Sequence, residues 1–131
     1  MRIVELKVDG YKAREVVHLN YALRQETDVE GQPTAVTRGG KIHVKVKALN
    51  EGNTEFLEWM VDPFLSKNGE ITFLKRDGTN MKTLKFEDAY LVDYEEDFDA
   101  LNDNSQFEIF TISAKKIEMG AAVHENQWTE A

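Results

Sequence analysis

The sequence predicts a mainly β protein, a β-barrel or compact sandwich with a single α-helix packed against it. Two observations predict this class. Apolar and polar residues alternate over several short runs separated by Asp-Gly and Asn-Gly pairs, whereas only residues 53–65 repeat apolar side chains at helical spacing. Because the chain has 131 residues, 41% of them hydrophobic, we expect one domain spanning residues 1–131.

The first two strands are predicted to form a hairpin. Residues 1–8 alternate between apolar and polar, and Asp9-Gly10 then provides a tight turn. The following strand places its apolar residues on one face, namely Val17, Leu19, Tyr21 and Leu23.

A loop is predicted from Asp28 to Gly40, where the apolar alternation stops. Gly31, Pro33 and Gly39 lie inside it. A loop of this length in a compact domain is typical of a functional segment, and the alternative is a mobile connector.

The strand from Lys41 to Ala48 is predicted to be half-buried. Its apolar residues fall on one face, while Lys41, His43, Lys45 and Lys47 fall on the other. The second face is a basic stripe, which either faces solvent or contacts an acidic protein surface.

The only predicted helix covers about residues 53–65, with Asn53 as its N-cap and Pro63 disfavouring further turns. At 100° per residue, its apolar arc extends over roughly 200°, with Trp59 at one margin. An arc this wide indicates a helix nested deeply in its own barrel or covered by a second subunit.

Later strands follow the Asn68-Gly69 and Asp77-Gly78 turns, for a total of about six. One strand face is predicted to carry Leu84, Phe86, Tyr90, Val92 and Tyr94. Asp88 interrupts this apolar face, which indicates either a β-bulge or a buried hydrogen-bond partner. A final strand carries apolar residues on both faces around Phe110, so we expect it to be covered on both sides. Its face-sharing pairs are Phe107 with Ile109, and Phe110 with Ile112.

The composition argues against several function classes. A net charge of -8 opposes nucleic-acid binding, and no segment reaches the length of a membrane span, so we expect no membrane insertion. The chain contains no cysteine, its three histidines have no ligand-like spacing, and the acidic run after Asp93 lacks the glycine and oxygen ligand of an EF-hand loop. We therefore predict no catalytic residues, no cofactor and no metal, and favour binding or assembly.

A set of short segments occurs in a specific order and spacing over almost the whole chain. These segments are Gln25-Glu26-Thr27-Asp28, Gly31-Gln32-Pro33, Thr37-Arg38-Gly39-Gly40, Glu58-Trp59-Met60, Lys75-Arg76-Asp77, Tyr90-Leu91-Val92-Asp93-Tyr94, Phe98-Asp99, Ser113-Ala114-Lys115 and Asn126-Gln127-Trp128. In their order and spacing they resemble the Hcp (TssD) family, the tube proteins of bacterial type VI secretion systems.

The resemblance implies a two-sheet β-barrel with one helix, six copies of which close into a ring. The rings stack into a hollow tube inside a contractile sheath, and contraction expels the tube behind a VgrG-like spike protein. Effector proteins travel in the lumen of some members, and the family is not enzymatic. The protein would be made in the cytoplasm and then secreted without a signal peptide.

The resemblance also implies roles for particular residues. An extended loop joins stacked rings, and its counterparts here are Asp28, Gln32, Pro33, Thr37, Arg38, Gly39 and Gly40. A ring uses two different surfaces of each subunit, so the basic stripe of Lys41, Lys45 and Lys47 either meets a neighbouring acidic surface or lines the lumen. Trp59 is a candidate anchor at the subunit interface.

Two alternatives remain at the level of sequence. The tail tube of a contractile phage, or of a phage-derived particle, has the same barrel design. A small ligand-binding or enzymatic barrel would instead be a monomer with a pocket.

Overall fold

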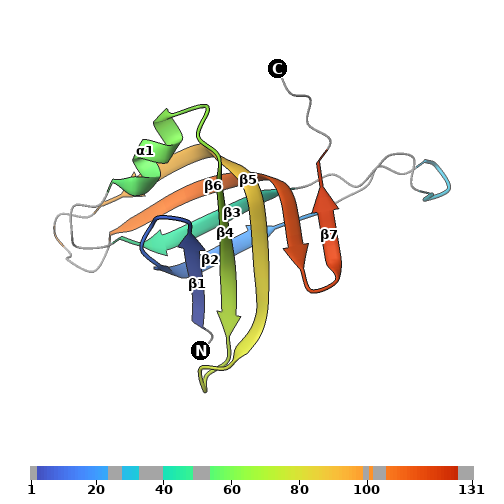
Figure 1. The fold of residues 1–131 in the computed structure, drawn as a ribbon, viewed down its shortest axis with the longest axis horizontal. Helices are drawn as coiled ribbons and strands as arrows, with labels where there is room; N and C mark the ends of the chain where they lie inside the picture. Colours follow the sequence, from blue (N-terminus) through green and yellow to red (C-terminus); the bar gives the residue numbers. More distant parts are fainter. Residues whose placement is uncertain are drawn as a thin grey trace.

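The computed structural model describes residues 3–23, 28–32, 40–48, 54–98, 101 and 106–126. These residues form seven strands and one helix, drawn in Figure 1. The elements are β1 (Ile3–Val8), β2 (Arg14–Tyr21), β3 (Lys41–Lys47), α1 (Glu55–Val61), β4 (Lys67–Leu74), β5 (Asn80–Asp97), β6 (Phe107–Met119) and β7 (Ala122–Glu125).

Six strands close into a barrel, which confirms the predicted class. The sheet order is β3-β2-β1-β4-β5-β6-β7, and an additional pairing of β3 with β6 joins the two ends of the six-stranded part. Residues 107–113 of β6 pair with β3, and residues 116–119 pair with β7. The second half of β6 therefore continues beyond the barrel as a hairpin with β7, a seventh strand that the sequence pattern did not predict (Figure 1).

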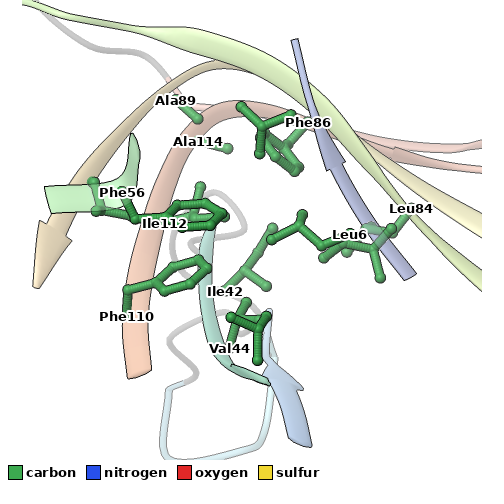
Figure 2. Close-up of a cluster of buried hydrophobic side chains, with 14 of the residues drawn as sticks. Leu6, Ile42, Val44, Phe56, Leu84, Phe86, Ala89, Phe110, Ile112 and Ala114 are labelled. Atoms are coloured by element: carbon green, nitrogen blue, oxygen red, sulfur yellow. The ribbon is translucent and has the colours of Figure 1, made fainter. Parts of the chain in front are cut away.

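The core is filled by the inward faces of the strands and by one face of α1. In β3 the predicted alternation is confirmed, because Ile42, Val44 and Val46 are buried. Phe56 of α1 stacks on Phe110 of β6 with ring centroids 4.5 Å apart. Figure 2 shows these side chains converging between the strands. Burying a side chain of this size contributes about 1.5–3 kcal/mol.

The helix is shorter than the predicted 53–65. It begins at Glu55 after Thr54, and its last helical residue is Val61, two positions before Pro63. Asp62 already has extended backbone angles, because the residue before a proline is disfavoured in the helical region. The predicted cap Asn53 lies outside the described residues.

Bulges change which residues face the core. Asp88 has φ +50° where β5 shifts register against β4, and its side chain is exposed, so the bulge interpretation is confirmed. A second shift follows Leu91 and exposes Val92, and a third in β2 exposes Val17. The predictions that Val17 and Val92 share the apolar faces of their strands are therefore wrong.

Candidate assembly surfaces

The basic stripe lies on the outer face of β3. Lys41, His43 and Lys47 are exposed, and Lys45 is half-buried with its Nζ 4.5 Å from the centre of the Phe107 ring. This contact is a cation–π interaction, which holds the Lys45 ammonium against the barrel wall.

Two further residues of the stripe contact neighbouring strands. Lys47 Nζ lies 3.7 Å from a carboxylate oxygen of Glu15, with both side chains more than half exposed. His43 Nδ1 lies 2.9 Å from Thr111 Oγ1. The stripe is thus a surface feature of one subunit, and it is open to contact by another molecule.

An acidic column runs parallel to the basic stripe on the same outer face. The register places His43 opposite Thr111 and Thr111 opposite Asp93, so these three residues form one row. Further exposed carboxylates in this column belong to Glu95 and Asp97. The two columns are two strand spacings apart, about 10 Å, with β6 between them.

Only part of the predicted ring-stacking loop is described. Asp28 and Gln32 are exposed and form a small turn, in which Asp28 Oδ1 accepts hydrogen bonds from the backbone N–H groups of Glu30 and Gln32. Pro33, Thr37, Arg38 and Gly39 lie outside the described residues.

Gly40 ends the loop inside the barrel wall. Its φ is +98°, and a Cβ there would lie 2.6 Å from the Ala114 carbonyl oxygen and 2.5 Å from the Asn126 side chain. Its own carbonyl accepts a hydrogen bond from Ala114 N–H at 2.8 Å. Only glycine fits this position, so Gly40 acts as an anchor of the loop rather than as a contacting side chain.

Trp59 does not lie on the surface. Its side chain is 0% exposed, and its Nε1–H donates a hydrogen bond to the Leu65 carbonyl at 2.9 Å. Trp59 therefore fixes the turn after α1 within its own subunit, and the prediction that its ring contacts a second subunit is wrong. The helical spacing predicts Trp59 at the margin of the apolar arc, and in the structure this margin of the helix faces the core.

The opposite side of α1 carries large exposed apolar side chains. Leu57 is 42% exposed, Val61 70% and Phe64, in the turn that follows, 89%. Of the two interpretations of the wide apolar arc, this arrangement favours a helix with one face in the core and one face available to a partner.

A buried ionic cluster was missed by the sequence analysis. Arg14 Nη2 lies 2.6 Å from Glu108 Oε1 inside the barrel, and the Tyr94 hydroxyl donates to Glu108 Oε2 at 3.1 Å. Burial, followed by the Glu108 charge, raises the pKa of Tyr94 above its ordinary value. The sequence contains two signals of this burial. Glu108 shares a strand face with the apolar Phe110, and Arg14 shares one with the apolar Val16.

The described residues contain no group of three or more His, Cys, Asp or Glu side chains placed to hold a metal ion. None of the helices within these residues is long and apolar enough to cross a membrane.

Solved structures share this fold. Hcp1 from Flavobacterium johnsoniae is 44% identical, with a TM-score of 0.85, and the match covers 95% of this chain and 99% of that one. Hcp1 from the E. coli EAEC 042 pathovar is 16% identical with a TM-score of 0.73, covering 97% and 98%. A chain of the anti-feeding prophage baseplate is 12% identical with a TM-score of 0.56, covering 90% and 91%. A search of curated proteins found no match.

The closed barrel, its single helix and these similarities define an Hcp-like tube-forming barrel. The sequence matches the family described as hemolysin coregulated protein Hcp (TssD) over residues 3–129. The chain belongs to the Hcp (TssD) family, whose members are structural tube proteins of type VI secretion systems.

Proposed function

We propose that this protein is the subunit of a type VI secretion tube, in which hexameric rings stack into a hollow cylinder that sheath contraction expels. The observation that carries the proposal is the end-to-end match to Hcp1 from Flavobacterium johnsoniae, at 44% identity on a shared barrel. A fold alone does not define a function. Here the family match over residues 3–129 supports the assignment in addition to the fold.

The partners follow from this role. The tube subunit contacts further copies of itself, the surrounding sheath, a VgrG-like spike and effector proteins carried in the lumen. It assembles in the cytoplasm and leaves through the injection apparatus without a signal peptide. These partners and this route are inferences from family membership.

Two parts of the chain are proposed to mediate assembly. The loop of residues 28–40 is proposed to contact the next ring through Asp28, Gln32, Pro33, Thr37, Arg38 and Gly39, with Gly40 as the buried anchor at its end. The exposed positions of Asp28 and Gln32 support this. The stripe of Lys41, Lys45 and Lys47 is proposed to lie at the subunit interface or in the lumen, because its outer face is free of covering elements within the described residues.

The test is negative-stain electron microscopy of the purified chain, combined with its mass from light scattering. Six-membered rings or stacked tubes are the expected result. A strict monomer at high concentration would contradict the proposal and favour the small ligand-binding barrel, for which a monomer with a pocket is expected.

A second candidate is the tail tube of a phage-derived particle. The similarity to the anti-feeding prophage chain, at 12% identity, shows a shared fold. Neighbouring genes distinguish the two, because a secretion system and a phage-derived particle are encoded with different baseplate and membrane-complex genes.

A further inference from the structure

The barrel wall is open where β1 and β2 diverge. These strands pair at only two positions, Glu5 with Glu15 and Leu6 with Arg14. From Val16 to Tyr21, β2 pairs with β3 alone among the described strands. The other edge of this stretch therefore presents backbone donors and acceptors with no neighbouring strand, a feature that proteins commonly cover with another element.

A groove of about 530 Å³ runs along this free edge. Its apolar lining residues are Val4, Val16, Val17, Leu19, Tyr21 and Phe73. His18 and Lys82 also line the groove, and the described lining contains no carboxylate. Lys82 is therefore the charged side chain of a groove whose lining is otherwise mostly apolar.

The exposed face of α1 has the complementary chemistry. Leu57 and Val61 are one helical turn apart. Phe64 follows in a turn, where its backbone N–H donates a hydrogen bond to Asp62 Oδ1 at 3.0 Å. Glu58 and Asp62 are exposed beside this face, and residues 54–66 contain no Lys, Arg or His. This surface is apolar with an acidic rim.

The two surfaces belong to different parts of the subunit. The backbone of α1 lies next to β5, and its buried Phe56 ring packs against Phe110 of β6 and the Arg14 guanidinium at the start of β2. The groove instead runs along the later part of β2 and the facing side of β1 and β4. Figure 1 shows α1 at the upper left, whereas β2 leaves β1 toward the right. A contact between them therefore joins two copies. Such a heterologous contact repeats from subunit to subunit and closes into a ring when the rotation permits.

We propose that the exposed face of α1, with Phe64 as its anchor, docks into the β1–β2 groove of a second copy of this chain. The proposal rests on the proposed function, because a tube ring requires a head-to-tail interface. Polarity and charge support this occupant, because an apolar surface edged by Glu58 and Asp62 meets a mostly apolar groove that carries Lys82. Phe64 is 89% exposed, and a large aromatic side chain of this kind is typical of an interface hot spot.

The first test replaces exposed apolar residues on the docking face. Phe64→Ser and Val61→Ser are expected to weaken ring formation by about 30-fold or more in a dilution series followed by light scattering. The melting temperature of the subunit should stay close to wild type, because both side chains are mostly exposed. Val123→Ser is the matched control, since Val123 is 56% exposed on β7, and it should leave the rings intact.

The second test exchanges charges across the interface. Glu58→Lys and Lys82→Glu should each weaken association by about threefold, and the double variant should recover most of the loss. If wild-type rings form and the Phe64 and Val61 variants form them equally well, the docking proposal is wrong and the proposed function stands. If the wild-type chain never associates, the proposed function fails and the docking fails with it.

Discussion

Two ion pairs in the same barrel have opposite environments. Arg14 and Glu108 are 94 positions apart in sequence, yet their charged atoms meet at 2.6 Å, with side chains 0% and 6% exposed. Lys47 and Glu15 meet at 3.7 Å on the outer face, with side chains 57% and 55% exposed. Because the two pairs differ in burial, loss of one partner should be costly in the buried pair and nearly neutral in the exposed pair.

The buried pair joins several elements at once. Arg14 of β2 donates from Nε and Nη2 to the Lys47 carbonyl of β3, at 3.2 and 2.8 Å. Its guanidinium carbon lies 5.1 Å from the centre of the Phe56 ring on α1. Glu108 of β6 also accepts from Tyr94 of β5. The cluster therefore links the strands on either side of the β3–β6 closure to the helix that covers them.

Removing one member of the buried pair should have the largest effect. Glu108→Ala leaves the Arg14 charge in the core without its carboxylate partner, so we expect a loss of about 3–5 kcal/mol of unfolding free energy. Glu15→Ala removes the same chemical group from the exposed pair and should cost less than about 1 kcal/mol. Urea unfolding of both variants measures the difference.

A double variant serves as the control for this prediction. Arg14→Met with Glu108→Leu replaces both charges by apolar side chains, and it should be more stable than Glu108→Ala alone, because no unpaired charge remains. Equal stability of Glu108→Ala and Glu15→Ala would show that the buried cluster contributes no more than a surface pair.

The same comparison explains what the sequence could predict. Strand alternation in residues 41–48 identified the buried and exposed faces of β3 correctly, because β3 has no bulge and one face meets solvent. In β5 the alternation failed. Each bulge, at Asp88 and after Leu91, adds one residue and so reverses which positions face the core. The inward-facing residues are Phe86 before the first bulge, Ala89 after it and Tyr94 after the second. A bulge depends on the partner strand, which a local pattern does not contain.

Site residues were predictable to a smaller extent. The pattern found the basic stripe because exposed charges follow the strand period. The prediction that Trp59 contacts a second subunit is wrong, because the sequence does not show which part of a roughly 200° apolar arc faces the core. Pairing of Arg14 with Glu108 was not predictable, since it needs the three-dimensional closure that joins β2, β3 and β6.

A pH titration should give an intermediate effect. Burial, then the charges of Glu55 and Glu58, raises the pKa of Tyr11 from 10.0 to about 12, and the pKa of Tyr94 is raised by burial and Glu108. Unfolded tyrosines ionise near pH 10, while the folded protein keeps these two neutral. Stability should therefore be fully present below about pH 10 and fall as the pH rises from about 10 to 12.

Urea unfolding at several pH values measures this fall. Tyr11→Phe should flatten the dependence, since phenylalanine does not titrate. Tyrosinate absorbance of the folded protein, followed against pH, measures the tyrosine pKa values directly. Ionisation of all four tyrosines near pH 10 would contradict the assigned shifts.

Charge reversal in the exposed stripe should change subunit stability least. Lys41→Glu combined with Lys45→Glu is expected to change the unfolding free energy by less than about 1 kcal/mol, including the loss of the Lys45 contact with the Phe107 ring. The same variant should weaken ring formation, because the stripe is proposed to meet an acidic surface of the neighbouring subunit. Light scattering at matched concentration measures assembly separately from folding. Unchanged hexamers would show that the stripe faces the lumen or solvent. A large loss of unfolding free energy would contradict the comparison, because it would mean that exposed charges contribute as much to stability as the buried pair.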